Sequence, residues 1–220
     1  MGSDKIKAVL FDMDGVLVDS EPVIEAAAIA ALKEYGVYAR PEDFSPFVGA
    51  GDGRYIGGVA EKYGLPYKDG MKERLYEIYF QMLEDNPGVF EGAVPLLESL
   101  EKKGYILALA SSADRIKVEA NLKTARIPES CFSVITAGED VSEKKPSPEI
   151  YLKTAEKLGV PPGECAVVED ALNGVKAAKS AGMPCIGIST SFSDGELKGA
   201  GADYVCGDIS GVYNVLEKIE

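Results

Sequence analysis

Two aspartates stand at the end of an apolar run near the start of the chain. Residues 11–15 read Phe-Asp-Met-Asp-Gly and follow directly after Ala8-Val9-Leu10. Ligands of open α/β sheets bind outside the carboxyl ends of the strands, and a chain that leaves a strand can turn both carboxylates toward one point. Mg²⁺ prefers one or two carboxylates with water and substrate phosphate, and an aspartate can accept a phosphoryl group covalently. Asp12 and Asp14 are therefore candidates for magnesium-assisted phosphoryl transfer.

The same short pattern also occurs in solvated turns and in calcium-binding loops. The calcium-loop pattern needs a third oxygen ligand where this chain has Val16, so that reading is not supported. An exposed turn would not usually follow a segment as apolar as Ala8 to Phe11. The motif needs support from the rest of the chain.

Three more polar clusters lie where expected strands or helices meet loops. Ser111-Ser112 follow an expected strand at 106–110, Glu169-Asp170 follow one at 165–168, and Lys144-Lys145-Pro146 precede an expected helix. Each cluster alone could have a purely structural role. The serines, Asp114 or Asp170 could cap a helix, and Lys145 could be a solvated lysine. The carboxyl ends of parallel strands converge on one crevice, so together they favour a phosphoryl-transfer site built from acids, a hydroxyl and an ammonium group.

The elements that would position these residues alternate along most of the chain. Further strands are expected at 6–12, 134–136, 185–188 and 204–206, with helices at 94–103, 115–124, 148–158 and 172–181. Continuous apolar strands joined by helices predict an α/β fold, a Rossmann-like parallel sheet covered on both faces. Residues 19–86 instead read as helical throughout, with helices at 21–35 and 71–83 and a stop at Asn86-Pro87-Gly88. We therefore predict a discontinuous catalytic core (1–18 and 87–220) and an inserted α-helical cap domain (19–86).

Composition limits the classes of partner. The 220 residues carry a formal net charge of −13, which disfavours nucleic acid and anionic membranes. The chain has no histidine, which excludes histidine-based triads and histidine-ligated zinc. The four cysteines form no Cys-x-x-Cys pair, so buried thiols in a reducing compartment are favoured. No signal peptide or apolar run of transmembrane length is evident, so we expect a cytoplasmic protein, with a monomer as the default.

The order of these motifs resembles the haloacid dehalogenase superfamily. Asp12-Met13-Asp14-Gly15-Val16, Ser111, Lys145-Pro146 and Glu169-Asp170 match its four motifs in order and spacing. The resemblance covers essentially the whole chain and includes the helical insertion after the first motif. The nearest groups are the β-phosphoglucomutase and phosphoglycolate phosphatase-like branch.

The resemblance implies a role for each matching position. Asp12 would be the nucleophile, and Asp14 would protonate the leaving oxygen and later deprotonate the acceptor. Mg²⁺ would be held by Asp12, the backbone carbonyl of Asp14, Asp170 and Glu169. The phosphoryl oxygens would be bound by Ser111, Ser112, Lys145 and the Met13 position. An Asp at position 14 argues for phosphoryl transfer, since members that break carbon–halogen bonds typically lack it.

The cap is harder to interpret. Gly49 and the segment 51–54 would form a loop that contacts the leaving group, with simple chain flexibility as the alternative; Arg54 also breaks the dinucleotide-binding glycine pattern. Asn173 would orient the last motif's loop. β-Phosphoglucomutases are expected to carry a histidine near Ile24 and an arginine and a lysine near Asp52 and Leu75, although Arg54 and Lys72 lie close enough to substitute.

The departures from the mutase pattern decide the preferred function. We predict a Mg²⁺-dependent phosphomonoester hydrolase that acts on a small phosphorylated metabolite, such as a sugar phosphate or a phosphoglycolate-like compound, through an aspartyl-phosphate. A phosphosugar mutase is the first alternative. A non-catalytic phosphate-binding module is the second, and the intact motif set disfavours it.

Overall fold

The computed structural model describes residues 5–84 and 88–219. Its centre is a six-stranded sheet in which every neighbouring pair is parallel, in the order β3-β2-β1-β4-β5-β6. The strands are β1 (Ala8–Phe11), β2 (Ile106–Ala110), β3 (Val134–Thr136), β4 (Cys165–Glu169), β5 (Cys185–Ile188) and β6 (Tyr204–Cys206). The first strand lies in the middle of the sheet, so the residues that follow β1, β2 and β4 emerge side by side.

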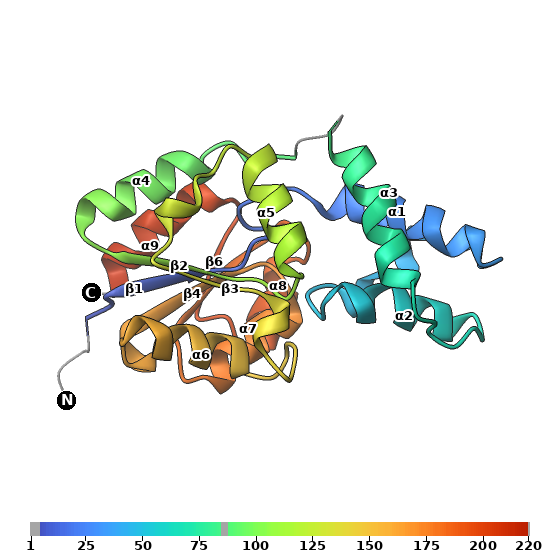
Figure 1. The fold of residues 1–220 in the computed structure, drawn as a ribbon. Coiled ribbons are helices and arrows are strands. Elements are labelled where there is room, and N and C mark those ends of the chain that lie inside the picture. The colour runs from blue at the N-terminus through green and yellow to red at the C-terminus, as the bar shows by residue number, and fades with distance from the viewer. Residues whose placement is uncertain (1–4, 85–87, 220) are drawn as a thin grey trace.

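Helices cover both faces of this sheet (Figure 1). One face packs against α4 (Ala93–Lys103), α5 (Arg115–Thr124) and α9 (Val212–Ile219), and the other against α6 (Glu149–Leu158), α7 (Leu172–Ser180) and α8 (Asp194–Ala200). Along β1 the side chains alternate between two hydrophobic clusters: Val9 and Phe11 join the first, Ala8 and Leu10 the second. This alternation is the period of two that a strand buried on both sides requires. The predicted α/β fold is confirmed.

A helical unit projects from one end of this core (Figure 1). It consists of α1 (Glu21–Glu34), α2 (Asp52–Lys62) and α3 (Met71–Leu83), with short 3₁₀ turns at Pro41–Asp43 and Ser45–Phe47. Its apolar residues form a hydrophobic cluster of their own. The boundaries 1–18, 19–86 and 87–220 stay our proposal, and the expected turn at Asn86-Pro87 lies outside the described residues.

The structure differs from the sequence prediction in a few elements. Helix α2 begins at Asp52. The loop expected at Gly49 and residues 51–54 therefore ends earlier than predicted, and residues 52–54 are helical. A helix with glycines in its interior has low intrinsic propensity, but Gly58 is needed for packing, because an added Cβ would lie 2.4 Å from a ring atom of Phe47. Helices α8 and α9 had not been predicted.

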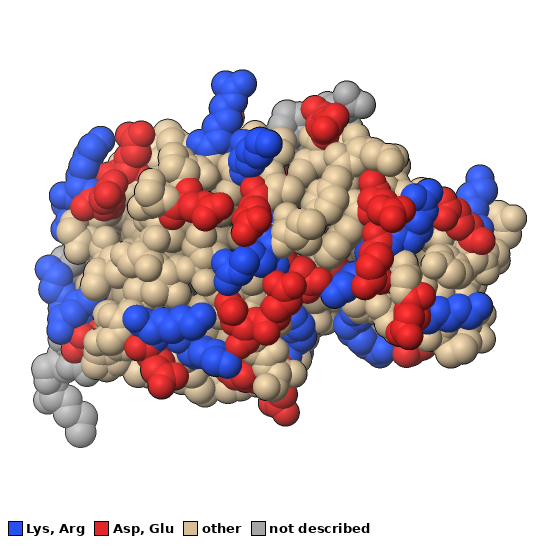
Figure 2. Space-filling view, in the orientation of Figure 1, with Lys and Arg blue, Asp and Glu red and all other residues tan. Residues whose placement is uncertain are grey.

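Two surface properties bear on possible partners. On the face drawn in Figure 2, acidic and basic side chains alternate, and the described residues there show no continuous basic stripe. Within 5–84 and 88–219, no helix combines the length and apolar character that crossing a bilayer requires.

Candidate active site

The nucleophile candidate Asp12 lies at the tip of the central strand. Its backbone N–H donates to the Val168 carbonyl at 3.0 Å, which fixes it beside the end of β4. The Lys145 Nζ lies 2.5 Å from Asp12 Oδ1 and 2.7 Å from Glu169 Oε1, and Lys145 is 2% exposed. The structure therefore brings Asp12 together with Lys145 and the last motif, which lie more than a hundred residues further along the chain.

Three buried carboxylates crowd this point. Ligand oxygens of Asp12, Glu169 and Asp170 all lie within 4.8 Å of one another. Burial and the neighbouring acids raise the pKa of Asp12 to about 7, against the opposing effect of Lys145. Burial and then Glu169 raise the pKa of Asp170 well above its usual range. A cation placed among these carboxylates would relieve their desolvation and mutual repulsion, so the donor set fits Mg²⁺.

The three acids are not equivalent. Glu169 already accepts hydrogen bonds from Lys145, the Tyr151 hydroxyl and the backbone N–H groups of Asp170 and Ala171. Asp170 accepts one from the Ser191 hydroxyl. The geometry favours Asp12 and Asp170 as direct ligands, with Glu169 holding Lys145 and the loop.

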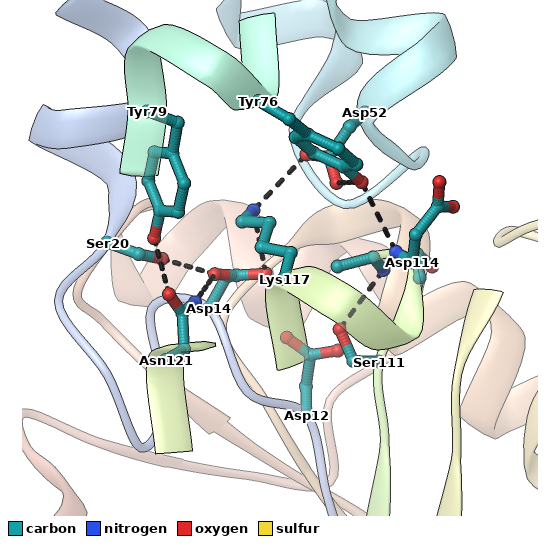
Figure 3. Close-up of polar contacts among 12 residues, drawn as sticks. Asp12, Asp14, Ser20, Asp52, Tyr76, Tyr79, Ser111, Asp114, Lys117 and Asn121 are labelled. Atoms are coloured by element: carbon teal, nitrogen blue, oxygen red, sulfur yellow. Dashed lines mark hydrogen bonds and ion pairs between the residues drawn. The ribbon is translucent and has the colours of Figure 1, made fainter. Parts of the chain in front are cut away.

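The second aspartate is held by residues that the sequence analysis did not single out. Asp14 accepts hydrogen bonds from the Ser20 hydroxyl and from Asn121 Nδ2 at 3.1 Å, and its Oδ2 lies 3.2 Å from Lys117 Nζ (Figure 3). Lys117 and Asn121 lie one turn apart on α5, so their side chains share one face of that helix. The sequence offers only a weak signal for them, two polar residues four positions apart soon after Ser111-Ser112, because their burial is seen only in the structure.

Lys117 also joins the core to the cap. Its Nζ lies 3.2 Å from Asp52 Oδ1, and Asp52 accepts a hydrogen bond from the Tyr76 hydroxyl at 2.7 Å (Figure 3). Burial lowers the pKa of Lys117, but the nearby carboxylates of Asp14 and Asp52 raise it by more. The pKa of Lys117 therefore lies well above its usual range. The Tyr79 hydroxyl donates to Asn121 at 2.6 Å. The candidate acid–base group is thus connected to cap helices α2 and α3.

The candidate phosphate-binding residues occupy different environments. Ser111 is buried, and its hydroxyl accepts a hydrogen bond from the Ala113 N–H at 3.1 Å. The buried Ser112 hydroxyl has no hydrogen-bond partner among the described residues. The Met13 side chain belongs to the hydrophobic core, so only its backbone could contact a phosphoryl group.

The three residues predicted to act with the cap also differ in their contacts. Gly49 approaches the core so closely that an added Cβ would lie 2.9 Å from the Ala171 Cβ, and its φ is +75°. Asn173 Nδ2 donates to the Val48 carbonyl at 3.3 Å, which ties the loop before α2 to α7. The Arg54 guanidinium instead lies 2.6 Å from Glu61 Oε2 and 5.1 Å from the Phe47 ring centroid. Arg54 is not among the residues that line the site.

Several of these groups line a hollow between core and cap. Its cavity volume is about 30 Å³. The core contributes Asp12, Asp14, both serines and Asp170, and the cap contributes Glu21, Gly49, Asp52 and Tyr55. Asp12 and Asp170, two of the candidate metal ligands, therefore line a pocket between the core and the helical cap.

Comparison with known proteins agrees with this arrangement. Residues 6–182 match the haloacid dehalogenase-like hydrolases. The chain is 38% identical over 215 residues to a phosphorylated carbohydrates phosphatase of Thermotoga maritima, covering 90% of this chain and 92% of that protein. It is 44% identical over 213 residues to SUPPRESSOR OF QUENCHING 1, a chloroplastic protein of Arabidopsis thaliana; this alignment covers 94% of the chain but only 20% of the larger protein.

Solved structures are similar over nearly the full length. A hydrolase from Pseudomonas syringae superimposes with a TM-score of 0.86 at 30% identity, covering 97% of this chain and 99% of that one. A β-phosphoglucomutase from Clostridium difficile shares the fold, with a TM-score of 0.87 at 23% identity over 97% of both chains. Phosphoglycolate phosphatases are also among the similar proteins.

The chain belongs to the haloacid dehalogenase-like hydrolase family. The resemblance inferred from its four motifs is confirmed, and so is the prediction of an enzyme of this hydrolase type.

Proposed function

We propose that this protein is a Mg²⁺-dependent phosphomonoester hydrolase that transfers the phosphoryl group of a small phosphorylated metabolite to Asp12. The observation that carries the proposal is the position of Asp12, which contacts Lys145, lies within 4.8 Å of a ligand oxygen of Asp170 and lines the same pocket as Asp14. Similarity to phosphatases of phosphorylated carbohydrates supports this substrate class.

The residues divide the work as follows. Asp12 attacks phosphorus, and the P–O bond to the leaving group breaks. Asp14 gives its proton to the departing oxygen and then takes one from the water that attacks the aspartyl-phosphate. Lys117 and Asn121 hold the Asp14 carboxylate for both steps. Lys145, Ser111 and Ser112 would bind the phosphoryl oxygens.

Asp12 and Asp170 would hold Mg²⁺, with Glu169 in support. The ion would neutralise the phosphoryl oxygens. Without it, the crowded carboxylates would repel a phosphate dianion, so activity should require it.

The contacts of the cap cations disfavour the mutase alternative. A mutase must hold a bisphosphate in two orientations, which needs a cationic site for the second phosphate. Lys72 Nζ lies 2.5 Å from Asp114 Oδ2 and Arg54 is paired with Glu61. At the position where a mutase histidine is expected, the apolar Ile24 lines the pocket. Water is therefore the acceptor we propose.

A ³¹P NMR time course with Mg²⁺ and a panel of sugar phosphates and phosphoglycolate tests the proposal. We expect inorganic phosphate to accumulate with the wild-type protein and not with Asp12→Asn. Residual activity of Asp12→Asn above about one part in a thousand would contradict an obligate nucleophile. A new phosphate ester without inorganic phosphate would establish the mutase instead. The cytoplasmic location and monomeric state stay predictions.

A further inference from the structure

Ser191 holds one oxygen of the candidate metal ligand Asp170. It lies in the loop that follows β5 (Cys185–Ile188), the strand that neighbours β4 in the sheet. The Ser191 hydroxyl donates a hydrogen bond to Asp170 Oδ2. Ser191 is partly buried and stands outside the four sequence motifs. A side chain from the loop after β5 thus fixes part of the acid that follows β4.

The first motif encloses the same oxygen. A Cβ added to Gly15 would lie 1.9 Å from Asp170 Oδ2 but 3.1 Å from Oδ1, so the glycine backbone packs against the Oδ2 side of the carboxylate. The Thr190 hydroxyl donates to the Gly15 carbonyl at 2.6 Å, which joins the loop after β5 to this turn. The hydrogen bond and the close packing therefore act on one and the same carboxylate oxygen.

The second oxygen of Asp170 is left for a ligand. Among residues 5–84 and 88–219, no hydrogen bond reaches Asp170 Oδ1, although Asp170 is 1% exposed and lines the pocket beside Asp12. A ligand oxygen of Asp170 also lies within 4.8 Å of one from Asp12. The carboxylate is therefore arranged to offer a cation one oxygen rather than two.

The number of oxygens that a carboxylate offers affects the choice of cation. Mg²⁺ requires near-ideal octahedral coordination, keeps several waters and is usually bound through one or two carboxylates. Ca²⁺ takes about six to eight oxygens in a flexible geometry and often binds both oxygens of one carboxylate. A carboxylate whose second oxygen is held in a hydrogen bond suits Mg²⁺ and removes a ligand from Ca²⁺.

We infer that Ser191 is a positioning residue, which restricts Asp170 to one ligand oxygen and thereby makes the site select Mg²⁺ over Ca²⁺. The inference rests on the proposed function and deepens it, because it names a residue that sets the choice of cation. Ser191 does not line the pocket that contains Asp12, so it acts through Asp170. Hydrogen-bond partners of metal-ligating side chains typically change metal affinity by about 10–100-fold.

Thermal unfolding at increasing concentrations of MgCl₂ or CaCl₂ tests this inference without turnover. The rise in Tm with free metal gives a dissociation constant for each ion, with NaCl added to keep the ionic strength constant. Asp170→Asn gives the rise that comes from metal bound elsewhere on the acidic chain. Ser191→Ala removes the hydroxyl, and Ser191→Thr retains one. Ser189→Ala is the matched control, because its hydroxyl donates to the Cys206 carbonyl at 3.0 Å, at the start of the same loop.

Ser191→Ala should bind Mg²⁺ about tenfold more weakly, while its Ca²⁺ affinity falls much less or increases. The ratio of Mg²⁺ to Ca²⁺ affinity should therefore fall several-fold, and Ser191→Thr and Ser189→Ala should keep the wild-type ratio. An equal loss for both ions in Ser191→Ala would overturn the inference, because a merely structural role affects both ions alike. An unchanged ratio in Ser191→Ala, or the same fall in Ser191→Thr, would also overturn it. Failure of the proposed function is distinct: Mg²⁺ would bind, but p-nitrophenyl phosphate would not be hydrolysed, or Asp12→Asn would hydrolyse it.

Discussion

Replacing Lys117 by methionine removes an ammonium group that joins the candidate acid–base residue to the cap. The Lys117 side chain is 3% exposed, and those of its partners Asp14 and Asp52 are 15% and 9% exposed. Methionine keeps the approximate length of the side chain, so the change is mainly the loss of charge. It leaves two carboxylates facing each other across the boundary between core and cap without the cation between them.

The expected loss follows from burial and from the contacts that remain. Removing one partner of a buried ion pair destabilises a protein by roughly 3–5 kcal/mol. Asp14 keeps its hydrogen bonds from Ser20 and Asn121, and Asp52 keeps that from Tyr76. These contacts place the expected loss at the lower end, about 3 kcal/mol. Adding Asp52→Asn to Lys117→Met removes one of the stranded charges and should recover about 1–2 kcal/mol.

Urea unfolding followed by far-ultraviolet circular dichroism measures these differences. Lys123→Met is the matched control, because Lys123 lies exposed on the same helix and its loss should change stability by no more than about 0.5 kcal/mol. If Lys117→Met were as stable as this control, the ion pairs would not hold the cap to the core. If the second substitution recovered nothing, the loss would not come from the stranded carboxylates.

Four further outcomes follow from the same geometry. Without Mg²⁺, the raised pKa values of Asp12 (about 7) and Glu21 (about 8) mean that the folded state binds more protons than the unfolded state between about pH 4 and pH 8, so stability should fall as pH rises through that window. Because Mg²⁺ competes with these protons, saturating Mg²⁺ should raise Tm by several degrees at pH 8 and by little at pH 5; a rise independent of pH would contradict a carboxylate site. Gly15→Ala should abolish Mg²⁺ binding and turnover, since an added Cβ would lie 1.9 Å from Asp170 Oδ2 at a φ of +78°, and calorimetry showing normal binding would refute this. Tyr151→Phe should lower stability by about 1 kcal/mol through the lost 2.9 Å bond to Glu169, measured by urea unfolding, and an unchanged midpoint would show that the bond contributes nothing.

The sequence predicted the parts of the structure that depend on local pattern. Apolar runs placed the strands because a parallel sheet buried on both faces requires them. The motif residues at strand ends met in space because parallel strands end at one edge. Asp12, Ser111 and Asp170 were therefore expected to lie close together before their positions in the fold were known.

The contacts between core and cap could not be predicted in the same way. Lys117 reads as one more charge on a helix, and only the fold shows that it meets Asp14 and Asp52, which are distant in sequence. Arg54 illustrates the opposite case: its position suggested a ligand contact, but its side chain pairs with Glu61, two helical turns along α2. Which way a surface side chain turns depends on neighbours that the sequence pattern does not specify.

The covalent intermediate tests the central claim most directly. With p-nitrophenyl phosphate the leaving group departs without a proton, so Asp14→Asn should still be phosphorylated at Asp12 but hydrolyse the adduct slowly, for want of a base. Acid quenching and intact mass measurement of Asp14→Asn with Mg²⁺ should therefore show one phosphoryl group per protein. The same experiment on an Asp12→Asn/Asp14→Asn double variant should show none. An adduct that persists without Asp12 would contradict the assignment of Asp12 as nucleophile.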